Sequence, residues 1–248
     1  ANNIGPGDYV IIPSMTFLAT ANAVRYSGAE IIFSDVDPNN GLMNASHFED
    51  AIKRSTNKNI KAICAVHLNG QCVDMGGFSD KIGELVILED ACHSLGAFQS
   101  NKSEKKFRVG SCALSKATMF STHAVKAITT GEGGIITTND ENLALKLKQL
   151  RSHGVIRNKD LGQNTSLSLA EINNFKQPWY YEMPELGFNY RLSDIHCALG
   201  ISQLRKLKYF IERRNSLRKR YENYLKRLGK FVQPVTLVPN CTPAWHLS

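Results

Sequence analysis

The sequence predicts an α/β fold with a mostly parallel central sheet flanked by helices. From residue 8 to about residue 150, short runs rich in Val and Ile alternate with segments of helical periodicity. These runs are apolar along their whole length, which is typical of strands that are buried on both faces of a parallel sheet. Ligands of such sheets bind at the carboxyl ends of the strands, so we expect the functional residues there.

The predicted elements follow one another in a regular order. The strands cover residues 8–13, 30–36, 60–68, 84–91, 114–122 and 133–138. The helices cover residues 15–28, 45–55 and 139–154, and the last is expected to begin at a capping Asn139 or Asp140. Residues 155–185 are polar, contain two prolines and break the pattern, which is typical of a functional or disordered loop. Helical periodicity returns over residues 190–207, with Ser193 as the expected cap.

Composition excludes some classes of protein. The 248 residues are 42% hydrophobic and 21% charged, as in ordinary globular domains, and no apolar run is long enough to cross a membrane. The chain begins without Met, in what looks like a helix-to-strand connection, and it ends where an apolar pattern begins. We therefore expect the chain to be truncated at both ends, and we do not interpret its N-terminus as a signal peptide.

The net charge of +8 raises the question of an anionic partner. Much of the excess lies in residues 205–230, where apolar residues recur at helical spacing between the charges. This pattern favours the solvated face of an amphipathic helix over a polyanion-binding face. The sequence contains no nucleic-acid-binding motif, so we expect neither a nucleic-acid nor a membrane partner.

The six cysteines include no CxxC pair, and several lie in apolar stretches. They resemble small core residues more than a disulfide framework, which favours a reducing, cytoplasmic location. Their spacing predicts no metal site.

The stretch VILEDACHSLGA, residues 86–97, ends an apolar strand on Glu89 and Asp90 and places His93 three residues later. One interpretation is a helix-capping Asp with a nearby core His. The other is a carboxylate that faces the ring nitrogen of a bound cofactor, an arrangement that pyridoxal phosphate requires. The stretch alone leaves both interpretations open.

The stretch FSTHAVKAITTGEGG, residues 120–134, follows another predicted strand. Ser121 and Thr122 are small donors suited to phosphate oxygens, and the glycines allow a tight turn back into the sheet. The stretch is not a Walker A loop, because Lys126 precedes the glycines. A solvated lysine is the default interpretation, but apolar neighbours lower the pKa of an amine and favour Schiff-base chemistry.

The third stretch, PSMTFLATANA at residues 13–23, passes from a strand end into a helix. Phe17 is either an ordinary core residue or an aromatic ring that stacks on a planar cofactor.

These stretches together resemble one enzyme family. PSMTF, VHLNGQCVDM, LEDACHSLGA, FSTHAVKAITTGEGG, RSHG and ELGFNYRLSDIHCALGISQL, in this order, are similar to the DegT/StrS-type nucleotide-sugar aminotransferases, which are fold-type-I pyridoxal phosphate enzymes. The segment PWYYEMPELGFNYR is similar to the subgroup that aminates C4 of UDP-4-keto-6-deoxy-N-acetyl-altrosamine on the way to pseudaminic acid.

The resemblance implies a role for each site residue. Lys126 matches the lysine that holds pyridoxal 5'-phosphate covalently, and Asp90 matches the partner of its pyridine nitrogen. The other matches are His93 near the cofactor's 3-hydroxyl, Phe17 stacked on the ring, Ser121 on the phosphate, and Asn189 reaching the phosphate from a neighbouring subunit. The roles of Thr16, His123 and Arg191 stay open. The family's upstream part of the phosphate site precedes PSMTF and is not in this chain.

The resemblance also implies domains, reaction and partners. Residues 1–205 would form the large cofactor-binding domain without its N-terminal segment, and residues 206–248 a linking helix and the start of the small C-terminal domain. The implied reaction aminates a nucleotide-linked 4-keto-6-deoxy sugar, UDP-linked or otherwise, with glutamate as donor, in a homodimer with shared sites. The alternatives are a dehydratase or deoxygenase of the same fold, which replaces the lysine by histidine, and a non-catalytic descendant of the fold.

Overall fold

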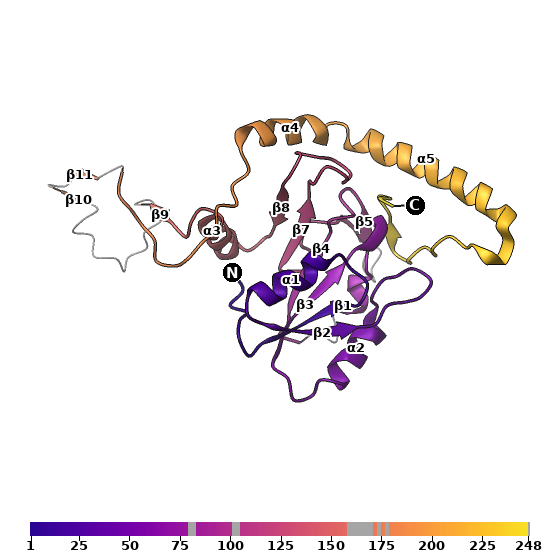
Figure 1. Cartoon of the computed structure of the whole chain (residues 1–248), viewed down its shortest axis with the longest axis horizontal. Helices are drawn as coiled ribbons and strands as arrows, with labels where there is room; N and C mark the ends of the chain where they lie inside the picture. Colours follow the sequence, from indigo (N-terminus) through magenta and orange to yellow (C-terminus); the bar gives the residue numbers. More distant parts are fainter. Residues whose placement is uncertain (79–82, 101–104, 158–170, 173–174, 177–178, 248) are drawn as a thin grey trace. The chain divides into compact units, whose positions relative to one another are not determined.

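The computed structural model describes residues 1–78, 83–100, 105–157, 171–172, 175–176 and 179–247 (Figure 1). The chain divides into two compact units. The first, here called the sheet unit, contains residues 2–139 and 194–248, and the second, the insert unit, contains residues 140–193 together with Ala1.

The sheet unit is built on a six-stranded sheet with the order β2-β1-β3-β4-β7-β8. Neighbouring strands from β2 to β7 pair in parallel, and β8 is antiparallel to β7. The predicted mostly parallel sheet is thus confirmed. The strands are β1 (Tyr9–Pro13), β2 (Glu30–Ser34), β3 (Ile60–Val66), β4 (Val86–Asp90), β7 (Ala117–Ser121) and β8 (Gly134–Thr137).

Both faces of the sheet are buried at its central strands, as their apolar sequences predict, whereas the edge strand β8 is mostly exposed and does not fit that prediction. Alternate residues of β1 enter two different core clusters, with Ile11 in one and its neighbours Val10 and Ile12 in the other. The first cluster includes Phe48 of α2 (Ala45–Lys53), and the second includes Val24 of α1 (Leu18–Tyr26). Helices therefore cover opposite faces, so the carboxyl edge of the sheet remains as the place for a site.

The first helix begins later than the sequence pattern predicts. The predicted helix starts at residue 15, whereas α1 starts at Leu18, because Phe17 has extended backbone angles of φ −72° and ψ 145°. The second helix begins where predicted, since the Asn44 side chain accepts hydrogen bonds from the amides of Ser46 and His47. The late start of α1 leaves Phe17 in the connection between β1 and α1.

A second, three-stranded antiparallel sheet was not predicted. It has the order β13-β5-β6 and consists of β5 (Phe98–Ser100), β6 (Lys106–Arg108) and β13 (Cys241–Thr242). Because β13 lies near the end of the chain, the C-terminal segment returns to the sheet unit beside β5 (Figure 1). Two short 3-10 helices, η1 (Leu68–Gly70) and η2 (Met75–Gly77), follow β3.

The predicted amphipathic helix is α5 (Leu207–Leu225), which follows α4 (Asp194–Leu204) and leads into η3 (Lys226–Phe231). Its first half behaves as predicted, because Ile211 packs against the third core cluster. Farther along, in the second half of α5 and in η3, apolar residues of the same helical spacing are exposed, namely Tyr221, Tyr224 and Leu228. The buried residue of α5 is Arg218, which stacks on the Trp245 ring at 3.5 Å from its centroid. A guanidinium that lies flat on an aromatic ring can be buried in place of an apolar residue.

The insert unit begins with α3 (Glu141–Leu150), which is capped by Asp140 through the Leu143 amide as predicted. The predicted loop at residues 155–185 contains four two-residue strands: β9 (Ile156–Arg157), β10 (Glu171–Ile172), β11 (Phe175–Lys176) and β12 (Tyr181–Glu182). The remaining residues between positions 158 and 178 lie outside the described residues. After β12, Asn189 forms an isolated bridge with Ser152.

Within the described part of the chain, no helix is both long enough and apolar enough to cross a membrane. All six cysteines are free thiols.

Candidate active site

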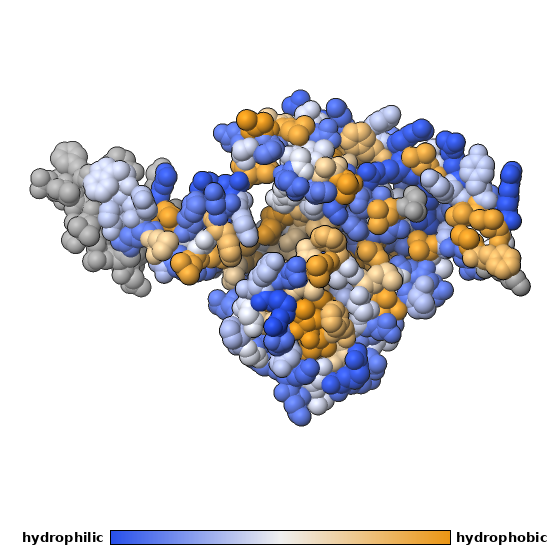
Figure 2. All heavy atoms as spheres, viewed as in Figure 1, coloured by the Kyte–Doolittle hydropathy of each residue, from blue (hydrophilic) through white to orange (hydrophobic). Residues whose placement is uncertain are grey.

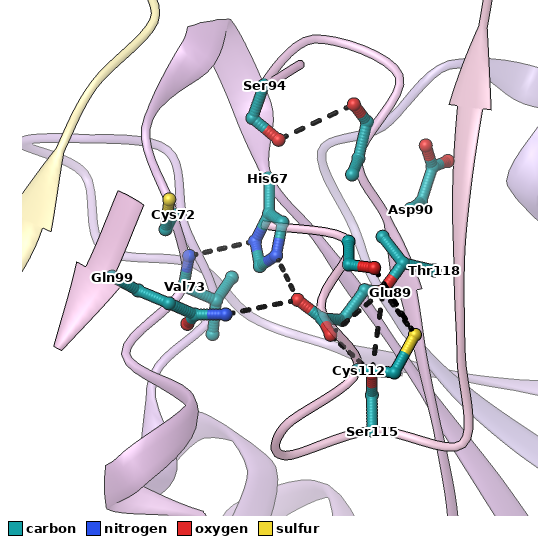
Figure 3. Close-up of polar contacts among 12 residues, drawn as sticks. His67, Cys72, Val73, Glu89, Asp90, Ser94, Gln99, Cys112, Ser115 and Thr118 are labelled. Carbon is teal, nitrogen blue, oxygen red and sulfur yellow. Dashed lines mark hydrogen bonds and ion pairs between the residues drawn. The ribbon is translucent and has the colours of Figure 1, made fainter. Parts of the chain in front are cut away.

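The end of β4 carries two carboxylates that point to opposite sides of the sheet (Figure 3). Asp90 is half-buried, and its Oδ2 accepts a hydrogen bond of 2.7 Å from the Thr20 hydroxyl of α1. Its Oδ1 accepts the Cys92 amide at 3.2 Å, and Thr16 joins the chain through a 2.8 Å contact with Thr20. The carboxylate of Asp90 is thus oriented from one side by a helix and from the other by the loop that follows β4.

The neighbouring Glu89 is only 1% exposed and serves a different purpose. Its Oε2 accepts hydrogen bonds from His67 Nε2 at 2.7 Å and from Gln99 Nε2 at 3.3 Å (Figure 3). Its Oε1 accepts the hydroxyls of Ser115 and Thr118. Burial by itself raises the pKa of Glu89, but the interaction with His67, followed by the hydrogen bonds from Ser115 and Thr118, outweighs burial and lowers it.

His67 links this network to the loop after β3. The Val73 amide donates to His67 Nδ1 at 3.0 Å, so that nitrogen carries a lone pair and the single ring proton lies on Nε2. The ring is therefore a neutral donor to the Glu89 carboxylate. All four groups around Glu89 donate hydrogen bonds to it. This arrangement suits the ionised carboxylate, which can only accept hydrogen bonds.

Lys126 lies in a loop that folds back on itself between β7 and β8. Its amide donates to the His123 carbonyl at 3.0 Å, and farther along Thr130 N donates to the Thr122 carbonyl at 2.9 Å. Two glycines, Gly131 with φ 81° and Gly133 with φ 157°, return the chain to β8, as the sequence predicts. The loop thus holds the half-buried Lys126 at the carboxyl end of β7.

The ends of β4 and β7 bring four of the predicted site residues together. Asp90 is in register with Met119, two residues before Ser121, and the Ser121 backbone is one of the groups that influence the pKa of the Cys92 thiol. Burial first, and then the nearby Asp90 charge, raise the pKa of Cys92 to about 12, whereas the Lys126 charge opposes the change. Burial and the Lys126 charge lower the pKa of His93. Asp90, His93, Ser121 and Lys126 therefore form one charged cluster, which we call the edge cluster.

Phe17 lies at the start of α1, three residues before Thr20, which binds Asp90. Its side chain is 74% exposed, so it is not a core residue of the described structure. An exposed aromatic ring, three residues from the threonine that binds Asp90, is suited to stacking on a planar ligand.

Three further residues that the sequence singled out, His123, Asn189 and Arg191, lie in different parts of the chain. His123 is on the Lys126 loop and forms a 3.5 Å contact with Glu132. Asn189 is exposed and belongs to the insert unit, and Arg191, also in that unit, is exposed as well. Their predicted roles toward the cofactor or a neighbouring subunit stay predictions.

Sequence reasoning missed four residues around the edge cluster. Thr20 could have been noticed, because Thr16 and Thr20 are spaced by one helical turn. Asn69, Arg214 and His246 had no detectable signal, since they meet only because the C-terminal segment returns to η1. His246 lies against His93, with ring centroids 4.5 Å apart.

The edge cluster fits pyridoxal 5'-phosphate by its chemistry. That cofactor has an aldehyde, a basic ring nitrogen, a planar ring and a phosphate, which call for an amine, a carboxylate, an aromatic face and small donors. Lys126, Asp90, Phe17 and Ser121 provide these groups in that order. In contrast, the described residues contain no group of three or more His, Cys, Asp or Glu side chains placed to hold a metal ion.

The fold of this chain is similar to that of solved aminotransferases. A DegT DnrJ EryC1 StrS aminotransferase from Brucella abortus superimposes with a TM-score of 0.77 at 29% identity, over 99% of this chain and 59% of that one. PseC from Helicobacter pylori, an aminotransferase involved in pseudaminic acid biosynthesis, gives a TM-score of 0.72 at 30% identity, over 89% and 52% of the two chains.

The chain belongs to the DegT/DnrJ/EryC1/StrS aminotransferase family, whose pattern it matches over residues 1–248. It is 37% identical to GDP-perosamine synthase of Caulobacter vibrioides, over 94% of this chain and 55% of that protein. It is also 37% identical to UDP-4-amino-4,6-dideoxy-N-acetyl-beta-L-altrosamine transaminase of Campylobacter jejuni, over 88% and 51%. The chain spans a little over half the length of these relatives. The resemblance seen in the sequence is confirmed.

Proposed function

We propose that the protein is a pyridoxal-phosphate aminotransferase that converts a nucleotide-linked 4-keto-6-deoxy sugar into the 4-amino sugar, with glutamate as the amino donor. The observation that carries the proposal is the edge cluster, where a lysine and an oriented carboxylate lie at adjacent strand ends in a chain of this family. When bound, the cofactor supplies an electrophilic aldehyde and an electron sink.

Each residue of the edge cluster has a task in this proposal, and so have Phe17 and Thr20. Lys126 would hold the cofactor through its amine and would move the proton at the reacting carbon of the donor and of the sugar. Asp90 keeps the proton on the pyridine nitrogen, and the Thr20 hydroxyl orients its carboxylate. Phe17 stacks on the ring, His93 faces the 3-hydroxyl and Ser121 binds the phosphate.

The nucleotide of the substrate is the least constrained part of the proposal. A relative named for a GDP sugar and one named for a UDP sugar are equally similar to this chain, at 37% identity. The PWYYEMPELGFNYR segment favours the UDP-linked 4-keto-6-deoxy sugar of the pseudaminic acid route. A dehydratase is less favoured, because it would carry histidine in place of Lys126.

A homodimer is part of the proposal. The α4 helix has no buried residue, and apolar side chains gather over it (Figure 2). Its exposed large apolar residues are Ile195, Leu199, Ile201 and Leu204. A second copy packed against α4 would cover part of this exposed apolar surface, and the proposed role of Asn189 requires such a copy. A fully cofactor-loaded protein that stays monomeric by light scattering would contradict this part.

Domain limits and location complete the proposal. Residues 1–205 would form the cofactor-binding domain, with residues 206–248 as the link to the next domain. Six free thiols favour the cytoplasm.

The deciding experiment incubates the full-length protein with pyridoxal phosphate, ¹⁵N-glutamate and a panel of GDP-, UDP- and dTDP-linked keto sugars. Mass spectrometry should show ¹⁵N in one sugar product, and the Lys126→Ala variant should form none. A product that has lost oxygen without gaining nitrogen would instead establish the dehydratase or deoxygenase alternative.

A further inference from the structure

The C-terminal segment is seated on η1 by backbone hydrogen bonds. Ala244 N donates to the Gly70 carbonyl at 3.0 Å, and His246 N donates to the Asn69 carbonyl at 3.3 Å. Leu247 N donates to Asn69 Oδ1 at 2.7 Å. The fit is close, because a Cβ added at Gly70 would lie 2.1 Å from the Ala244 oxygen. The position of the His246 ring is therefore set by the fold of η1.

Asn69 connects this segment to the edge cluster. Its backbone has a left-handed φ of 58°, which asparagine tolerates better than most residues. In that conformation its amide donates to His93 Nδ1 at 3.4 Å while its carbonyl and side chain hold residues 246 and 247. One residue thus aligns the two rings, His93 and His246, whose centroids are 4.5 Å apart.

Two arginines of α5 hold the same segment from the other side. Arg214 Nη1 lies 3.1 Å from His246 Nδ1, and Arg218, one helical turn later, stacks on Trp245. Arg218 is fixed further by the Val235 carbonyl and by Glu222. Arg218 therefore anchors the segment, whereas Arg214 reaches a ring of the candidate active site.

The contact with Arg214 decides where His246 carries its proton. A guanidinium only donates, so His246 Nδ1 must accept, and the single proton of the neutral ring lies on Nε2. Burial first, and then the nearby positive charges of Lys126 and Arg214, lower the pKa of His246 to about 4, which keeps the ring neutral at physiological pH. By the same argument, the Asn69 amide leaves His93 with its proton on Nε2.

We propose that Arg214 is a positioning residue of the active site, which holds His246 as the Nε2–H tautomer so that this N–H binds a carboxylate oxygen of the amino donor. The inference rests on the proposed function. A carboxylate suits the place, because Lys126 and Arg214 are cationic and both imidazoles offer donors there. Arg214 acts through His246 and not by contact with the reacting atoms.

The first test reads the tautomer directly. Long-range ¹H–¹⁵N spectra of the full-length protein should show His246 protonated at Nε2 between pH 6 and 8, and Arg214→Met should give a mixture of tautomers. Arg214→Lys should restore the Nε2–H form in part, because the ammonium is also only a donor. The control is Arg213→Met, since Arg213 is its exposed neighbour on α5. A wild-type His246 protonated at Nδ1 would overturn the proposal without any variant.

The second test reads the donor half-reaction. For Arg214→Met we expect the KM for glutamate to rise roughly tenfold, with cofactor affinity and the KM for the keto sugar unchanged. In a His246→Phe background, Arg214→Met should add no further effect. If Arg214→Met changed the KM for glutamate, the KM for the keto sugar and the cofactor affinity by similar factors, or changed none of them, Arg214 would have only a structural role. Failure of the cofactor to attach to Lys126 would instead overturn the proposed function, and the tautomer result would still stand.

Discussion

Glu89 and Asp90 are neighbours at the end of β4, yet their surroundings differ completely. Glu89 is enclosed on one side of the sheet by four hydrogen-bond donors. Asp90, on the other side, is half-buried and held by Thr20 and the Cys92 amide. The alternation of a strand thus separates a carboxylate that holds β3, β4 and β7 together from one that is free to act on a ligand.

The largest expected effect separates the two carboxylates by activity. Asp90→Asn should lower kcat/KM for amino transfer at least about a hundredfold, because a neutral amide does not stabilise the protonated pyridine. Its unfolding free energy should change by less than about 1 kcal/mol, since shape and half-burial are retained. Steady-state kinetics and denaturant unfolding measure both. If Asp90→Asn retained nearly normal activity, Asp90 would not be a residue of the active site.

Glu89→Gln should show the opposite behaviour. We expect the free energy of unfolding to fall by about 3 kcal/mol, because the amide NH₂ would face groups that themselves donate. Activity per folded molecule should stay within about threefold of wild type. The matched control is Ser115→Ala, which removes one donor and keeps the carboxylate. If Glu89→Gln folded normally and lost activity, the two carboxylates would have exchanged roles.

The pH dependence of stability should also reflect the structural role of Glu89. The folded pKa of Glu89 is lowered from its ordinary value of 4.5, so its contribution to stability is present above that value and is lost as the pH falls through the folded pKa. Wild-type unfolding free energy should therefore drop more steeply below about pH 4.5 than that of Glu89→Gln. Parallel curves would mean that the folded and unfolded pKa values of Glu89 are equal.

The smallest effect concerns the support of Asp90. Thr20→Val removes the hydroxyl that donates to Oδ2 but keeps the side-chain shape. We expect cofactor affinity to fall about fivefold, the equivalent of one hydrogen bond. Thr16→Val, one step farther from the carboxylate, should have a smaller effect. Equal affinities by fluorescence titration would show that Asp90 needs no such support.

The sequence predicted the strands, the faces that they bury and the residues at their ends, because these depend on local periodicity. It did not predict that β8 runs antiparallel or that Phe17 lies outside α1. It also could not separate the roles of Glu89 and Asp90, since both simply end an apolar run. The sequence did not point to His246, because its position depends on contacts between residues far apart in the chain: the neighbouring Leu247 bonds to Asn69 across 178 positions. Contacts of that kind follow from tertiary packing alone.

The most direct test of the account is the identity of the lysine that carries the cofactor. The full-length protein loaded with pyridoxal phosphate is reduced with borohydride, digested and mapped by tandem mass spectrometry, with Lys126→Ala and the exposed Lys61→Ala as the matched pair. We expect a pyridoxyl group on Lys126 in wild type and in Lys61→Ala, and no labelled peptide in Lys126→Ala. A label on another lysine, or one that persists in Lys126→Ala, would contradict this expectation.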